Sequence, residues 1–396
     1  MAKISAEKQP EFIAKAKKRW QVIDDYESDQ RDEMLDDSKF SVADNDWQWL
    51  SDDVTARKAS NRPFITVDRT SQFTDNVKNN YRQQNPAIKI SPTDEGEQEK
   101  IAERRQGLVR HISYTSKAQM ARTQAFDDSV TMGRGHYLVK TEYLPDSFNQ
   151  IITEEPINDP LSVYCDIRRK KPDYSDCEWG FILTPHLREE FEDMYPDASV
   201  AGWSGGKDVV WATETTVTVA EYYLKHPVKR TLLKVEEDGL TRTLYKDELE
   251  DVKYKEIKSK VIEEREVDDR EWWYYKLIDD DILEQRKLPF KEFPIITFIG
   301  QETVVDGELS LRGLLRKIKQ LGRLYNFVTS QIAELISLAP KTRYIAAEGQ
   351  LEDYENEWAN ANTTANPTLT YKPKTHEGQL LPPPHLKKKC LPLKLC

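Results

Sequence analysis

The chain of 396 residues is long enough for two or three domains, and its 9 tryptophans and 18 tyrosines argue against wholesale disorder. It has 58 basic and 69 acidic residues, and the formal net charge of −11 repels nucleic acid at long range. This balance excludes an ordinary tight DNA-binding protein. The same charge balance permits a local basic stripe, or a role in which DNA passes through the protein without binding tightly.

Composition also narrows the compartment and the chemistry. The first residues contain no apolar signal-peptide core, and the longest apolar run, residues 293–299, is far too short to cross a bilayer. The four cysteines (Cys165, Cys177, Cys390 and Cys396) match no zinc-ligand spacing. We therefore expect a reduced, cytosolic protein with no metal, no cofactor and no membrane attachment.

No catalytic motif stands out. The six histidines are scattered, and no nucleophile elbow, zinc-protease helix or kinase loop is present. Acidic residues are so abundant that the sequence cannot single out a catalytic pair. We expect the protein not to be an enzyme.

The first part of the chain alternates helical and extended patterns. Residues 6–38 predict one or two amphipathic helices, whose acidic outer surface (Asp24, Asp25, Glu27, Asp29 and Asp32) is interpreted as a solvated face. A helix is expected to end near Asn85, followed by a strand at 87–90. Residues 95–130 predict a second long helix, which a Gly-Arg-Gly turn at 133–135 separates from a strand at 136–143.

The middle of the chain is typical of antiparallel sheet. Strands are predicted at 216–224, 231–235, 252–261, 271–278 and 293–299, with turn signals between them. Acidic residues at 263–269 fit an exposed edge, where charge discourages unwanted strand pairing.

Residues 308–338 predict one long helix with two distinct faces. One face is apolar at alternating spacings of three and four, formed by Leu311, Leu314, Ile318, Leu321, Tyr325, Val328, Ile332 and Leu335. Another face is polar, with the cations Arg312, Arg316, Lys319 and Arg323 followed by Asn326 and Ser330. The apolar face needs a partner surface, whereas the basic face suits water or anions. Ser310 is the expected N-cap, and Pro340 limits the helix at its other end.

The remaining residues predict a small lobe and a tail. A strand at 342–346, a short helix at 351–360 and a strand at 365–372 form the lobe. Residues 382–396 contain no acidic residue and no periodicity, so we expect the tail to be disordered.

An ordered set of short stretches resembles the portal proteins of short-tailed (podovirus-type) phage heads. An example is Tyr-Arg-Gln-Gln-Asn-Pro-Ala-Ile-Lys-Ile-Ser-Pro at 81–92. The stretches are residues 47–49, 62–67, 81–92, 133–137, 157–160, 173–179, 293–296, 312–316 and 320–330. Their order over residues 30–380 carries the resemblance.

The resemblance implies an α+β portal-type fold and a ring of twelve subunits at one capsid vertex. Double-stranded DNA would be packaged through the ring by the terminase large subunit and ejected through it, without sequence-specific binding. Capsid, scaffolding and tail adaptor proteins are the other implied partners, in the virion and in the host cytoplasm during assembly. Arg312, Arg316, Lys319 and Arg323 would face DNA phosphates or acids of a neighbouring subunit.

The resemblance also assigns domains. Residues 1–300 form a wing, 301–339 a stem helix, 340–375 a clip and 376–396 an aberrant disordered tail. Family members continue beyond the clip, so the expectation is a product truncated after this region, for example a prophage-derived one with a frameshift near the lysines at 387–389. Two other classes are kept open: a non-viral coiled-coil interaction scaffold, and a hydrolase with an unrecognised acid pair.

Overall fold

The computed structural model describes residues 4, 8–92, 97–198, 200, 202–203, 209–237, 240–248, 260–306, 308–337, 344–359, 369–374, 378–380 and 382–386. The chain divides into two compact units. The first comprises Met1–Leu50 and Thr66–Leu324, and the second comprises Ser51–Ile65 and Tyr325–Cys396. The boundary falls within α9.

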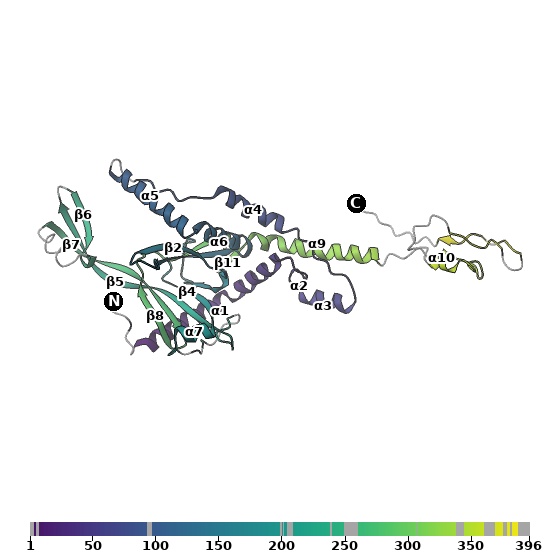
Figure 1. Ribbon diagram of the computed structural model, residues 1–396, viewed down its shortest axis with the longest axis horizontal. Helices are drawn as coiled ribbons and strands as arrows, with labels where there is room; N and C mark the ends of the chain where they lie inside the picture. The colour runs from purple at the N-terminus through teal and green to yellow at the C-terminus, as the bar shows by residue number, and fades with distance from the viewer. Residues whose placement is uncertain are drawn as a thin grey trace. The chain divides into compact units, whose positions relative to one another are not determined.

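The described helices and strands alternate along the chain (Figure 1). The helices are α1 (Gln9–Ser41), α2 (Asn45–Gln48), α3 (Ser51–Ala59), α4 (Ser71–Gln84), α5 (Glu97–Thr115), α6 (Ala118–Met132), α7 (Arg188–Met194), α9 (Leu314–Ser337) and α10 (Glu355–Ala359). The strands are β1 (Arg134–Tyr143), β2 (Gln150–Pro156), β3 (Val163–Cys165), β4 (Trp179–Leu187), β5 (Thr216–Glu237), β6 (Leu240–Tyr245), β7 (Val261–Ile278), β8 (Asp281–Lys287), β9 (Ile295–Ile299), β10 (Gln301–Val305), β11 (Glu308–Arg312), β12 (Tyr344–Ile345) and β13 (His385–Leu386).

A twisted antiparallel sheet forms the centre of the first unit. Its strand order is β3-β4-β5-β7-β8, and β6 pairs with the outer half of β5. The two longest strands pair over most of their length, from Ala220 opposite Leu277 to Val235 opposite Val261. The predicted strands at 216–224 and 231–235 therefore form one continuous strand, β5. The predicted strand at 271–278 is the last part of β7, and the acidic residues of 263–269 lie on β7 just before it.

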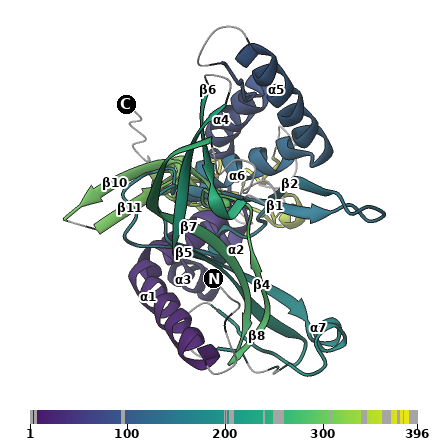
Figure 2. The same ribbon diagram turned by 90° about the vertical axis from the view of Figure 1, so that its left-hand side faces the viewer.

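Helix α1 covers one face of this sheet (Figure 2). Ile13, Ala16, Trp20 and Ile23, spaced three and four apart, pack against aromatic residues of the sheet. Trp20 is completely buried, and its ring lies 4.8 Å from that of Trp211 in an edge-to-face contact. The predicted amphipathic helix at 6–38 is thus confirmed, and its apolar face supplies much of the core.

A second sheet, β2-β1-β9, packs against α6. The two elements approach so closely at Gly135 that a Cβ atom there would lie 1.9 Å from the carbonyl oxygen of Ala125. We expect Gly135→Ala to lower the free energy of unfolding by about 1–3 kcal/mol, because backbone must shift to admit the methyl group. Urea denaturation measures this loss.

Gly107→Ala is the matched control for that substitution. Gly107 lies within α5 with open space around its Cβ position. Alanine there should stabilise the helix by about 0.5–1 kcal/mol. Equal effects of the two substitutions would contradict the close packing of β1 on α6.

Two predicted boundaries are wrong near α9. Residues 308–312 form β11, which pairs with β10 from Gln301 opposite Arg312 to Val305 opposite Glu308. The helix begins at Leu314, so the predicted helix start at 308 and the predicted N-cap Ser310 are both wrong. Gly133 and Thr131 crowd the backbone at Gly313, where a Cβ would lie 2.3 Å from the Thr131 oxygen, and the chain changes from strand to helix there.

Other local predictions meet a mixed outcome. The helix end near Asn85 is confirmed, with Asn85 in the left-handed conformation as C-cap. The strand predicted at 87–90 is absent, and the long helix at 95–130 is two helices separated at Lys117, whose φ is 51°. Residues 252–259 and 365–368 lie outside the described residues.

The second unit contains the predicted small lobe in part. Strand β12 matches the predicted strand at 342–346, and α10 falls within the predicted helix at 351–360. The prediction of disorder is wrong at 385–386, because β13 pairs with β12. The Gln350 side chain also donates to the Pro382 carbonyl oxygen at 2.8 Å, which holds the chain before this strand. The α+β class with antiparallel sheet is confirmed.

Candidate functional site

Helix α9 has an inverted distribution of polarity. Leu315, Lys319, Gly322, Asn326 and Ser330, spaced three and four apart, form its buried face. Among these only Leu315 has a large apolar side chain. Lys319 is 6% exposed, and Asn326 and Ser330 are less exposed still. A helix whose buried face is polar requires specific partners for each side chain.

In the first unit, those partners are acidic residues of α1. Lys319 Nζ donates to Asp36 Oδ2 at 2.7 Å and to Asp37 Oδ1 at 2.6 Å. Arg316 Nε donates to Asp37 Oδ2 at 2.7 Å, and its Nη1 contacts Glu33. Arg323 Nη2 donates to Asp36 Oδ1 at 2.8 Å. Three of the four predicted cations therefore form ion pairs with α1 of their own chain.

The two aspartates of this network differ in electrostatics. Burial raises the pKa of Asp37 above its ordinary value, although Lys319 and Arg316 oppose the shift. Asp36 is less buried than Asp37. Burial alone would raise the pKa of Asp36, but the hydrogen bonds and charges of Lys319 and Arg323 outweigh this effect and lower the pKa. Asp37 is fully buried, so its two cations are what permit a carboxylate there.

We expect Lys319→Ala to lower the free energy of unfolding by about 1–3 kcal/mol, because Asp37 keeps only Arg316 as its charged partner. Chemical denaturation at pH 7 measures the loss. The double variant Lys319→Ala with Asp37→Asn should be less destabilised than the sum of the two single variants. Additive losses would mean that the two side chains do not interact.

The opposite face of α9 is apolar and exposed. Seven side chains on it are between 42% and 71% exposed. They are Leu321, Leu324, Tyr325, Val328, Ile332, Leu335 and Ile336. We call them the apolar face of α9. Exposed apolar side chains gathered on one face are typical of interaction sites.

The predicted stem-packing residues divide at the start of the helix. Leu321, Tyr325, Val328, Ile332 and Leu335 belong to the apolar face. Leu311 is buried in β11, while Leu314 and Ile318 are partly buried. That these five exposed side chains pack against a partner surface stays a prediction.

In the second unit, an extended segment holds the other half of α9. The Ile65 N–H donates to Ser330 Oγ at 2.9 Å. The Arg57 guanidinium lies 4.7 Å from the Phe327 ring centre, and Arg62 Nε lies 3.3 Å from Glu334 Oε1. Ser330, which the sequence placed on the basic face, is thus a buried acceptor for the distant backbone N–H of Ile65.

A second charged cluster holds α1 against β1, and sequence reasoning missed it. Arg134 donates from Nη1 and Nη2 to both carboxylate oxygens of Glu27, at 2.9 and 2.7 Å. Arg31 Nη2 lies 2.9 Å from Glu27 Oε2 and also donates to the Val163 carbonyl at 2.6 Å. Burial would raise the pKa of Glu27, but the charges of Arg134 and Arg31 lower it to about 2.

Arg312 differs from the other three predicted cations. It lies in β11, is exposed, and donates from Nε to Ser310 Oγ at 3.1 Å. Within the described ranges it makes no ion pair, whereas Arg316, Lys319 and Arg323 all do. The sequence signal for those three was the acidic cluster Glu33, Asp36 and Asp37, which follows the acidic residues interpreted as a solvated face.

The described part of the chain contains side chains of the types that could hold a metal ion or act as reactive thiols. Within it, no group of three or more histidine, cysteine or acidic side chains is arranged to hold a metal ion. Cys165 and Cys177 are buried and free, and burial raises the pKa of the Cys165 thiol to about 12. No helix among the described residues is both long and apolar enough to span a membrane.

Comparison with known proteins identifies the fold family. The model of the phage P22-like portal protein family matches residues 17–389, and the chain belongs to that family. A curated protein named portal protein, from Acyrthosiphon pisum secondary endosymbiont phage 1, is 27% identical over 321 residues. The match covers 76% of this chain and 44% of that relative, so the chain spans less than half of the relative's length. The predicted resemblance to podovirus-type portal proteins is confirmed.

Proposed function

We propose that the chain is a portal subunit that assembles into a closed homo-oligomeric ring through which double-stranded DNA enters and leaves a phage head. Family membership supports the assignment. The observation that carries it within the molecule is the apolar face of α9, because it is exposed in the single chain. Members of a ring bury such a face between neighbours.

The buried ion pairs of α9 strengthen this proposal. Lys319 and Arg323 fix the helix to Asp36 on α1, so the helix presents a defined face rather than rotating freely. Rotation of α9 to hide its apolar face would leave Asp37 buried without its cations. The exposed apolar face is therefore maintained by the fold itself.

The net charge of −11 supports DNA passage in preference to DNA binding. Three of the four predicted channel cations are neutralised by α1, and Arg312 is the remaining candidate for contact with phosphates or a neighbouring subunit. The finer features follow the family resemblance: twelve subunits, a wing at 1–300, a stem at 301–339 and a clip at 340–375. Terminase, capsid, scaffolding and tail adaptor proteins are the proposed partners, in the virion and in the host cytoplasm during assembly.

Native mass spectrometry of the purified chain tests this assignment. A closed ring should give one dominant oligomer whose subunit number does not grow with protein concentration. The competing coiled-coil scaffold would give dimers or trimers, and an open heterologous contact would give a concentration-dependent series. Either of those results would contradict the portal assignment.

A further inference from the structure

The outer surface of α5 is basic and partly apolar. Ile101, Arg104, Arg105, Leu108 and His111 fall on one side of the helix and are all exposed. We call these five residues the α5 basic face. Neither arginine makes an ion pair with another described residue. Exposed arginines beside exposed leucine and isoleucine are typical of protein interfaces.

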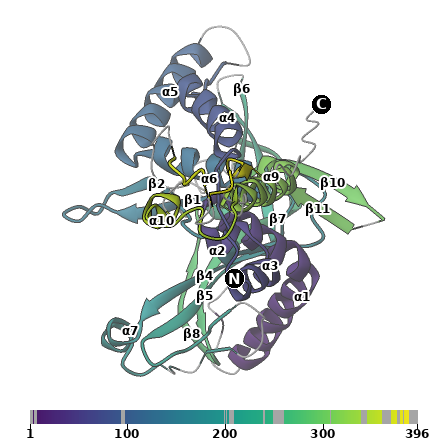
Figure 3. The same ribbon diagram turned by 90° about the vertical axis from the view of Figure 1, so that its right-hand side faces the viewer.

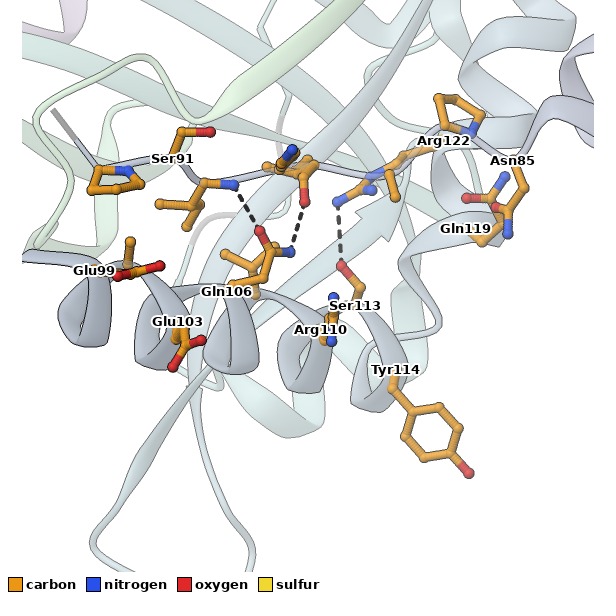
Figure 4. A pocket seen from close by; sticks show the side chains of 18 residues that line it. Asn85, Ser91, Glu99, Glu103, Gln106, Arg110, Ser113, Tyr114, Gln119 and Arg122 are labelled. Atoms are coloured by element: carbon orange, nitrogen blue, oxygen red, sulfur yellow. Dashed lines mark hydrogen bonds between the residues drawn. The ribbon is translucent and has the colours of Figure 1, made fainter. Parts of the chain in front are cut away.

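Two acidic side chains of α5 lie on a different side of the helix. Glu99 and Glu103 line a cavity of about 1000 Å³ between α5 and residues 85–92 (Figure 4). Gln106 spans this cavity, accepting from the Ile90 N–H at 2.7 Å and donating to the Ile88 carbonyl at 2.8 Å. Arg110 lines the same cavity, and neither Glu99 nor Glu103 belongs to the α5 basic face.

A groove of the opposite character lies between α1 and the β10–β11 hairpin. It has a volume of about 550 Å³ and is lined by Asp25, Tyr26, Asp29, Glu33 and Asp306 together with residues of β11. We call it the α1 acidic groove. Asp25, Tyr26 and Asp29 are exposed, as is Val305 at its edge, so the groove also combines charge with apolar surface. Arg312 is the cation that lines it.

The two surfaces lie on opposite sides of the first unit. In Figure 2, α1 and the β10–β11 hairpin are at the lower left and left, and α5 is at the upper right. Figure 3 shows the same separation from the other end. One chain therefore cannot bring its α5 basic face to its own α1 acidic groove, but two copies can.

We infer that the α5 basic face of one subunit docks against the α1 acidic groove of the next copy of this chain. This inference rests on the proposed ring and identifies one of its contacts. Opposite charges on two different faces specify a head-to-tail contact, in which every subunit uses both surfaces once. Exposed apolar side chains on each surface would be buried by the same contact.

A charge-exchange experiment tests the contact. The first variant is Arg104→Glu with Arg105→Glu, and the second is Asp25→Lys with Asp29→Lys. Each alone places like charges opposite each other at every contact, so we expect at least a tenfold loss of the oligomer by mass photometry. A one-to-one mixture restores opposite charges at each contact of an alternating ring, so the oligomer should return. All four side chains are exposed, so circular dichroism should show both variants folded.

The matched control is Lys15→Glu with Lys18→Glu, which changes the charge by the same amount on exposed lysines near the start of α1. It should assemble like the original chain. Normal assembly of both exchange variants, or failure of their mixture to assemble, would overturn this contact while leaving the ring itself intact. Absence of any oligomer from the original chain would instead overturn the proposed function.

Discussion

Replacing Leu324 and Val328 by glutamate should abolish the oligomer and leave the subunit folded. Both side chains are about half exposed on the apolar face of α9, and a charged residue there would have to be desolvated between neighbours. We expect the oligomer to fall by at least two orders of magnitude, which corresponds to about 3 kcal/mol per contact or more. Light scattering coupled to size-exclusion chromatography measures the loss.

The matched control for this variant is Lys15→Glu, which produces the same change in net charge. Lys15 is exposed on α1 and lies outside α9. It should leave the oligomer largely intact, and both variants should keep the thermal midpoint of the monomer within a few degrees. A double variant that assembles normally would show that the apolar face is not a subunit contact. One that unfolds would show that the face is buried within its own chain.

Arg134→Met should be among the most destabilising single substitutions, at about 3 kcal/mol at pH 7. The substitution leaves Glu27 buried with Arg31 as its neighbouring cation, and an incompletely compensated buried carboxylate is costly. Methionine fills much of the space, which separates the loss of charge from a cavity effect. Chemical denaturation measures the change, and Arg134→Met with Glu27→Gln should recover part of it.

The pH dependence of the same pair has a definite sign. The folded protein lowers the pKa of Glu27 from 4.5 to about 2, so the pair stabilises the fold above about pH 4.5. That stabilisation, about 3 kcal/mol, should be lost as the pH falls through this interval. Protonation of Glu27 removes the unpaired charge in Arg134→Met, so its deficit relative to the original chain should narrow at low pH. A deficit that stays constant with pH would contradict the charge pair as the cause.

The apolar periodicity of the sequence predicted α1 and the greater part of α9, since both helices repeat apolar residues every three to four positions. It did not predict which face of α9 is buried. Periodicity divides a helix into two faces, and here the more polar face packs within the chain. Asp36 and Asp37 lie about 280 residues before their cations, so their pairing depends on tertiary structure.

The local sequence pattern predicted the wrong conformation for two segments whose hydrogen-bonding partners lie elsewhere in the chain. Residues 87–90 alternate like a strand, yet the structure pairs Ile88 and Ile90 with the side chain of Gln106 and not with another strand. Residues 308–312 continue the helical pattern of α9 but pair with β10 instead. In both segments the hydrogen-bonding partner, which periodicity does not reveal, decides the conformation.

A cryo-electron microscopy reconstruction of the assembled chain would test the central claim most directly. The account predicts a closed ring in which the apolar face of α9 contacts neighbouring copies around a central opening, while Lys319 still reaches Asp36 and Asp37 of its own α1. A particle in which Leu321, Val328 and Ile332 point to solvent, with no neighbouring chain against them, would contradict it.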